Sequence, residues 1–206
     1  MTKRFSTFLL CLGLGICINT HAQSQSFLIL GDIHYDLLEN HDMEWLQKKP
    51  DDLRQVTTEY TQFTKKNWPA FSKQLRNRVK TYKPEIKAIL QLGDISEGLA
   101  GSEQKAEQMA QSVVKAVDAV AMSIPWIITK GNHDITGPGA QEAFIKYYIP
   151  MFQKQLDRTD IASANYAHQI GENLFVCFDP WEKKIDVLEL LEKNLKSSNA
   201  KYKFVM

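Results

Sequence analysis

The sequence predicts an α/β domain with a largely parallel sheet, and three observations support this fold class. Short apolar runs of strand length alternate with longer segments in which apolar residues recur at helical spacing. Such alternation is typical of parallel strands joined by helices. Polar motifs directly follow several of the apolar runs, as expected where ligands gather at the carboxyl ends of parallel strands. The 206 residues, 44% hydrophobic and 24% charged, are ordinary for one soluble domain.

Residues 1–22 are predicted to be a secretory signal peptide. Lys3 and Arg4 form a basic start, the apolar run 8–18 follows, and Ala22 ends a segment of the kind that a signal peptidase cleaves. The run is shorter than a membrane-spanning helix, so a retained anchor is the weaker alternative. A lipoprotein is weaker still, because bulky residues precede both cysteines of this segment. We therefore expect a secreted or periplasmic protein with no stable membrane anchor, whose domain occupies residues 23–206.

Five apolar runs are predicted to be strands, because they are short and bounded by polar or turn-forming residues. They cover residues 26–30, 88–92, 126–129, 174–178 and 201–206. Cys177 lies in the fourth run and is the single cysteine of residues 23–206, so it cannot form a disulfide within the domain. A buried strand position is favoured over a nucleophile for Cys177, because no histidine or basic residue is close in sequence.

Four helices are predicted between these strands. The first two cover residues 52–66 and 69–82, and Pro69 is expected to start the second, since proline fits the first turn of a helix. The third covers residues 102–122 with Ser102 as its cap, and the fourth covers 186–195. The third helix has an apolar face that is expected to point to the core, made of Ala106, Met109, Ala110, Val113, Val117 and Val120.

Three polar segments follow the first three predicted strands. They are Gly31-Asp32-Ile33-His34, Gly93-Asp94-Ile95-Ser96-Glu97 and, after Lys130, Gly131-Asn132-His133-Asp134. Each segment alone is compatible with a solvated loop, a turn or a helix cap. Their conjunction, each after a strand, predicts instead that they form one metal site.

The donor atoms of these segments fit that prediction. Asp32 and His34 would point the same way in an extended segment and could hold one ion. Asp94 has two carboxylate oxygens and can bridge two ions, Asn132 adds a neutral oxygen, and His133 can release a proton near neutral pH. Mixed oxygen and nitrogen donors favour Mn, Fe or Zn over calcium or copper.

The same three segments resemble the first three signature blocks of the calcineurin-like metallophosphoesterases, and the resemblance extends from about residue 26 to residue 206. It implies two packed mixed β-sheets flanked by helices. It also implies hydrolysis of a small phosphomonoester or phosphodiester substrate with two divalent metal ions. In this family pattern Asp32 and His34 bind the first metal, Asp94 bridges both, and Asn132 binds the second.

The resemblance further implies two catalytic residues. His133 is expected to contact the scissile phosphate and assist the leaving group, with Asp134 orienting its ring. In purple acid phosphatases, a branch of the family, a tyrosine ligand stands three residues after the bridging aspartate. This chain has Glu97 there, so a tyrosinate-bound iron site is not supported.

A second departure concerns the histidine blocks with which the family completes its site further along the chain. His41 and His168 lack the context of those blocks and are expected at surface or strand positions. We therefore expect the sequence to be a C-terminally truncated domain that is inactive or weakly active as this chain alone. The alternative is a non-catalytic fragment that binds a phosphorylated ligand or a partner protein.

A nuclease of the same family is the third hypothesis. The net charge of +1 is mixed along the chain, and neither a basic patch nor an array of stacking aromatic residues indicates a nucleic-acid surface. Residues 42–68 are longer than a strand-to-helix connection requires. With Trp181 they could shape a substrate pocket, although packing is the commoner role of such aromatic residues.

Overall fold

Two three-stranded sheets form the centre of the computed structural model, which describes residues 24–183 and 186–206. The predicted signal peptide, residues 1–22, lies outside these residues. The first sheet has the order β1-β2-β3 and is parallel throughout, with strands β1 (Ser26–Leu30), β2 (Ile86–Gln91) and β3 (Trp126–Ile128). The second sheet pairs β4 (Tyr166–Ile170) antiparallel with β5 (Asn173–Cys177), and β5 parallel with β6 (Tyr202–Val205).

The predicted fold class is therefore confirmed: an α/β fold with two three-stranded sheets flanked by helices, of which the second sheet is mixed. All five predicted strands are present within two residues of their predicted bounds, and β4, which contains His168, is an additional strand. No helix in the described part of the chain is long and apolar enough to cross a membrane. The α-helices are α1 (Met43–Leu46), α2 (Pro50–Gln55), α3 (Thr61–Thr81), α4 (Glu103–Val120), α5 (Ala140–Ala143), α6 (Ile149–Leu156) and α7 (Val187–Ser197).

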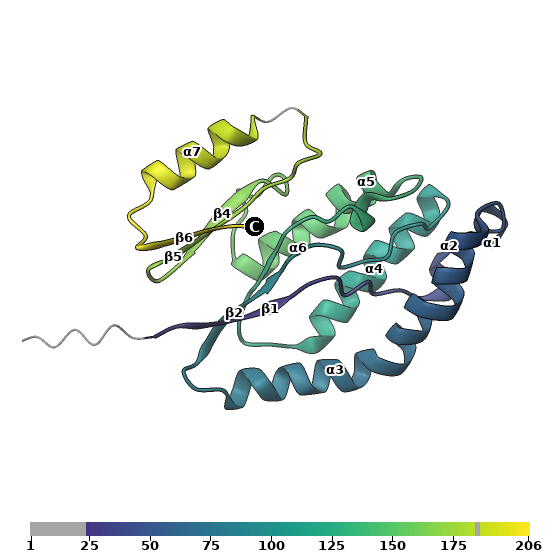
Figure 1. The fold of residues 1–206 in the computed structure, drawn as a ribbon, viewed down its shortest axis with the longest axis horizontal. Coiled ribbons are helices and arrows are strands. Elements are labelled where there is room, and N and C mark those ends of the chain that lie inside the picture. The colour runs from purple at the N-terminus through teal and green to yellow at the C-terminus, as the bar shows by residue number, and fades with distance from the viewer. Residues whose placement is uncertain (1–23, 184–185) are drawn as a thin grey trace, which may run out of the picture.

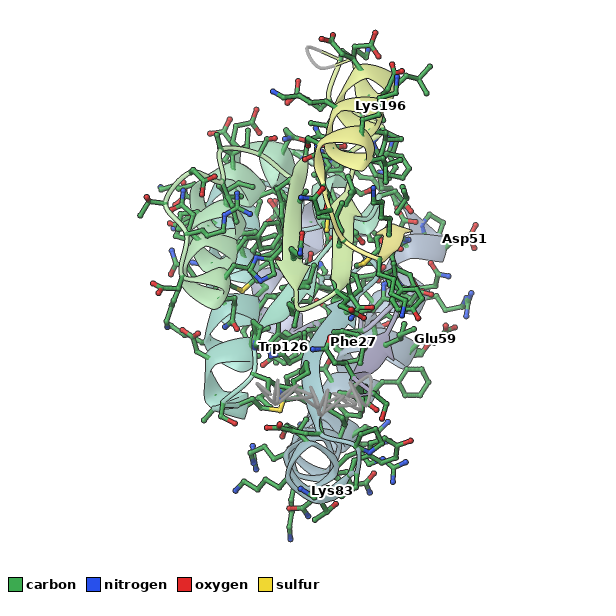
Figure 2. The ribbon with its side chains drawn as sticks, turned by 90° about the vertical axis from the view of Figure 1, so that its left-hand side faces the viewer. Phe27, Asp51, Glu59, Lys83, Trp126 and Lys196 are labelled. Atoms are coloured by element: carbon green, nitrogen blue, oxygen red, sulfur yellow. The ribbon has the colours of Figure 1, made fainter. Side chains whose placement is uncertain are left out.

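The sheets lie face to face between helices. In Figure 1, α7 lies on the outer side of the second sheet, and α3 lies on the far side of the first sheet. Figure 2 shows the same order from top to bottom, with Lys196 of α7, then Phe27 and Trp126 of the first sheet, then Lys83 beyond α3. Phe27 and Phe175 join the two sheets edge to face, with ring centroids 4.9 Å apart.

The predicted core face on α4 is confirmed. All six apolar residues of this face are buried. The apolar residues of α7, Val187, Leu188, Leu191 and Leu195, were also expected to face the core, but none of them is buried and Leu188 is 78% exposed. Cys177 is fully buried in β5, as predicted, and burial raises the pKa of its thiol to about 12. A thiol with such a pKa stays protonated at neutral pH and is a poor nucleophile.

The predicted helix break at Pro69 is wrong. Residues 61–81 form one helix, α3, with Pro69 inside it, and α2 leads into α3 through a π-helical turn, Val56–Tyr60. Proline normally disrupts a helix because it removes the hydrogen bond to the carbonyl group four residues earlier. Both Pro69 and Lys65, which carries that carbonyl group, are exposed. Water can therefore solvate the free carbonyl oxygen, and packing on either side of Pro69 keeps the helix continuous.

Candidate metal centre

The loops that follow β1, β2 and β3 meet at one edge of the first sheet, because the three strands run parallel. The backbone N–H of His34 donates to the carbonyl oxygen of Asp94 at 3.0 Å, which joins the first loop to the second. The backbone N–H of His133 donates to Asp94 Oδ1 at 2.8 Å, which joins the third loop to the same residue. Asp94 thus stands where all three loops meet.

Two groups of side chains in these loops are close enough together to be candidate metal sites. Donor atoms of Asp32, His34 and Asp94 all lie within 4.8 Å of one another, and so do donor atoms of His34, Glu97 and His133. The first group is the predicted set for the first metal and the shared aspartate. The second group shares His34 with the first and includes Glu97, which the sequence analysis did not place among the site residues.

Three of the predicted ligands have left-handed backbone conformations, with φ of 47° at Asp32, 45° at His34 and 51° at Asp94. Asp32 and His34 therefore do not lie in an extended segment, and that expectation is wrong. The loop turns at both residues, and this turn brings their side chains to Asp94. A non-glycine residue in this conformation costs about 1–3 kcal/mol and persists only where the surroundings hold it, commonly at functional sites.

Close packing of the second loop against the third explains the glycines of these motifs. A Cβ atom on Gly131 would lie 2.1 Å from Asp94 Oδ1 and 2.2 Å from the Asp94 backbone nitrogen. A Cβ atom on Gly93 would lie 3.0 Å from the Gly131 backbone. Asn132 is exposed and lies between Gly131 and His133, which both pack against Asp94. Its place at a second ion stays a prediction.

The buried residue Glu97 contacts the Nδ1 atoms of both histidines of the site. Its side chain is fully buried, and Oε2 lies 2.7 Å from Nδ1 of His34. Its backbone carbonyl oxygen lies 2.9 Å from Nδ1 of His133, and Oε1, which has no hydrogen-bond partner among the described residues, lies 3.6 Å from the same nitrogen. Because a carbonyl oxygen only accepts, Nδ1 of His133 carries the proton, and Nε2 is the atom left for a ligand.

These contacts shift the pKa values of the site. Burial by itself would raise the pKa of Glu97, but the nearby His133 ring and the hydrogen bond from His34 outweigh it and lower that pKa. The hydrogen bond with Glu97 raises the pKa of His133 to about 9. With Glu97 ionised, Nδ1 of His34 donates to its carboxylate, so the lone pair on Nε2 would be the one available to a metal ion. Anchoring of a ligand histidine by a carboxylate is the usual arrangement at protein metal sites.

Asp134 has a different role from the one that the resemblance implied. Its carboxylate accepts from the backbone N–H and the hydroxyl of Ser96, at 2.9 and 3.0 Å, and from the backbone N–H of Gly131 at 2.8 Å. Full burial raises its pKa to about 6. Asp134 therefore ties the third loop to the second, and the ring of His133 is instead oriented by Glu97.

Two residues that contact the site histidines, Tyr60 and Glu97, were not predicted from the sequence. Tyr60, at the end of the π-helical turn, stacks on His34 with ring centroids 4.7 Å apart and an angle of 25°. No local pattern marks Tyr60, because the contact depends on how α3 packs. Glu97 did carry a signal, since it lies three residues after Asp94 in a motif that had already been recognised.

The expectation for His41 is wrong, because its side chain is buried rather than at the surface or in a strand. Nε2 of His41 lies 2.7 Å from Asp36 Oδ1, and Nδ1 lies 3.0 Å from the carbonyl oxygen of Leu99. Both partners accept hydrogen bonds, so the ring donates from both nitrogens and pairs with the Asp36 carboxylate. The hydrogen bond to Leu99 fastens the segment after the first loop to the segment after Glu97.

A buried ion pair connects the third loop to the second sheet. Lys130, directly before Gly131, pairs with Asp179, which follows β5, and both side chains are almost fully buried. Asp179 Oδ1 also accepts from the backbone N–H of Trp181 at 2.9 Å. The pair fixes the start of the Gly131–Asp134 segment against the end of β5.

Comparison with known proteins gives one match of the same extent as the fold. The family model described as calcineurin-like phosphoesterase matches residues 26–205. A search of curated proteins found no significant match to the chain.

Proposed function

The chain belongs to the calcineurin-like phosphoesterases, a family of metal-dependent hydrolases of phosphoric esters, and from this premise we propose that its site hydrolyses a small phosphomonoester or phosphodiester with two divalent metal ions. The observation that carries the proposal is the position of Asp94. One of its carboxylate oxygens accepts from the third loop, while its donor atoms lie within 4.8 Å of those of Asp32 and His34. The carboxylate of Asp94 thus contacts the backbone of the third loop and lies near the candidate metal ligands of the first loop.

The side chains present fit divalent ions. Asp32, His34 and Asp94 supply two carboxylates and an imidazole to a first ion, and Asp94 with Asn132 would hold a second. Such donors suit Mn, Fe or Zn. Ions held there would supply Lewis-acid stabilisation to the phosphoryl oxygens.

His133 has the geometry of a proton donor to the leaving group. Its Nδ1 is engaged by the Glu97 carbonyl oxygen at 2.9 Å, so the ring is oriented and Nε2 faces no protein partner in the described hydrogen bonds. A positioned general acid typically contributes about 100- to 10,000-fold to a rate.

Among residues 24–183 and 186–206, the two proposed ions would have different numbers of side-chain ligands. The first would have three side-chain donors, and the second would have the carboxylate of Asp94 and the amide of Asn132. We expect the second ion to bind more weakly and hydrolysis by this polypeptide to be slow. The sequence of residues 1–22 supports action outside the cytoplasm, in a secreted or periplasmic location.

The test replaces the shared carboxylate. Asp94→Asn keeps the size of the side chain but removes its charge, so Mn²⁺ binding measured by calorimetry should fall by at least about tenfold, and Mn²⁺-dependent hydrolysis of p-nitrophenyl phosphate and of its bis ester should reach background. Asp118→Asn is the control, because Asp118 lies on α4 in an exposed pair with Lys154. Unchanged Mn²⁺ affinity in Asp94→Asn would contradict the proposal.

A second variant separates the role of His133 from metal binding. His133→Ala should slow hydrolysis by roughly 100-fold or more, while Mn²⁺ affinity changes little, because the first ion does not need this ring. Intact turnover in His133→Ala would rule out its role as the proton donor.

A further inference from the structure

A pocket of about 300 Å³ adjoins the metal site, between the loop that follows β1 and one face of α3. Asp32 lines one end of it, and Phe63, Asn67, Trp68 and Phe71 line the side that belongs to α3. Pockets of about 300–1,000 Å³ with mostly apolar walls and a few polar groups are typical of small-molecule sites. This volume is at the lower end of that range.

The helix face that lines the pocket begins at the metal site itself. Tyr60, Phe63, Asn67 and Phe71 are three or four residues apart, so they lie along the same face of the helix. Tyr60 stacks on His34 at one end of this row. With a rise of 1.5 Å per residue, Phe63 lies about 4.5 Å and Phe71 about 16 Å farther along the axis. A group held against Phe63 is therefore about one helical turn from Tyr60, which itself stacks on the candidate metal ligand His34.

The aromatic walls differ in how they are held. Trp68 packs edge to face against Tyr35 at 5.2 Å and lies 5.7 Å from Phe71, so its ring is supported from behind. Phe63 also lines the pocket and is 58% exposed, so most of its ring is not covered by protein. A fixed wall and an open ring on the same side provide a surface on which a flat group can stack.

The charges of the lining indicate what kind of group fits. Of the pocket's lining residues, all within the described part of the chain, Asp32 is the only charged one, and it is also a candidate metal ligand. The anionic end of a ligand is therefore directed to the ions, and its organic end meets uncharged aromatic walls. The volume suits a single ring rather than an extended chain.

We propose that this pocket binds the organic group of the substrate, and that the preferred substrates are phosphoesters whose organic group carries one aromatic ring. The inference rests on the proposed function, because it requires a phosphate at the metal site. It makes Phe63 a residue that determines substrate specificity.

The test measures binding without turnover. Phenylphosphonate and methylphosphonate have a P–C bond that a phosphoesterase does not cleave, so calorimetry with the Mn²⁺-loaded chain gives the Kd of each. Phenylphosphonate should bind more tightly, on the order of tenfold, because its ring leaves water. Phe63→Leu and Phe63→Ala should reduce this ratio toward one. Ile145→Ala, which removes an equally exposed apolar side chain outside the pocket, should leave it unchanged.

Three other results would contradict the pocket assignment, and one of them would also contradict the proposed function. Equal Kd values for the two phosphonates in the unmodified chain would overturn the pocket assignment and leave the proposed function standing. Binding of neither phosphonate with Mn²⁺ present would overturn the proposed function and the pocket assignment together. If Phe63→Ala lowers the melting temperature but leaves the ratio unchanged, Phe63 packs against polypeptide rather than substrate, and the assignment is wrong.

Discussion

Replacement of Gly131 by alanine should damage the site more than its small size suggests. The added methyl group would lie 2.2 Å from the backbone nitrogen of Asp94, whereas ordinary contacts begin at 3.4 Å. The second and third loops must therefore separate by roughly 1 Å. Because backbone atoms cannot rotate away as a side chain can, the separation of the loops should also lengthen the hydrogen bond from the His133 N–H to Asp94.

The size of the effect follows from two contributions. Forcing a methyl group into a packed region costs about 1–3 kcal/mol, and weakening a hydrogen bond to a charged acceptor costs about 1.5–3 kcal/mol. A loss of about 3 kcal/mol should lower the melting temperature by about 6–12 °C for a chain of this length. Since a 1 Å displacement in an active site can cost about 100-fold in rate, Mn²⁺-dependent hydrolysis should fall by a similar factor.

Gly31→Ala is the matched control for this prediction. Gly31 also lies directly before a predicted metal ligand, but no atom lies within 4 Å of the position that its Cβ would take. Thermal denaturation without metal and Mn²⁺ calorimetry should show near-normal values for Gly31→Ala and large losses for Gly131→Ala. Equal effects of the two substitutions would refute the argument that close backbone approach at Asp94 builds the site.

Three further predictions concern buried groups. Glu97→Gln should weaken Mn²⁺ binding by about 10- to 100-fold in calorimetry, because a neutral amide no longer anchors His34 as a carboxylate does; unchanged affinity would contradict this. Lys130→Met should destabilise the chain to urea by about 3–5 kcal/mol, since it leaves Asp179 buried without its partner, and a loss below 1 kcal/mol would refute it. Cys177, whose pKa burial raises to about 12, should react with iodoacetamide only in denaturant, as peptide mass spectrometry can show, and rapid labelling of the folded chain would contradict its burial.

The strands and the site loops could be predicted because their signals are local. Short apolar runs closely followed by Asp94 or by the Gly131–Asp134 segment identify strand ends, and parallel strands bring such ends together. Pro69 failed as a helix start because the cost of proline depends on whether the carbonyl group that it leaves free can be solvated. That depends on which side of α3 faces water, which is a property of the packed structure.

The partners of buried polar side chains could not be predicted for a related reason. Glu97 meets His34 across 63 residues of chain, and His41 meets the carbonyl oxygen of Leu99 across 58. Neither glutamate nor histidine favours burial, so sequence alone predicts an exposed position for Glu97 and His41 as long as their partners are unknown. Asp134 shows the same limit, because motif knowledge placed it beside a histidine ring while the fold gives it the N–H groups of Ser96 and Gly131.

The protein holds its candidate ligands in place through backbone and buried acids rather than through the ligands alone. Asp32, His34 and Asp94 keep strained left-handed conformations, which the loops alone would relax. Hydrogen bonds from His34 and His133 to Asp94 oppose that relaxation, and the buried Glu97 fixes both imidazole rings. A site organised before any ion arrives loses little conformational entropy on binding, so its affinity depends mainly on the number and charge of its donors. The substitutions that loosen this frame should therefore weaken metal binding even though none of them removes a ligand atom.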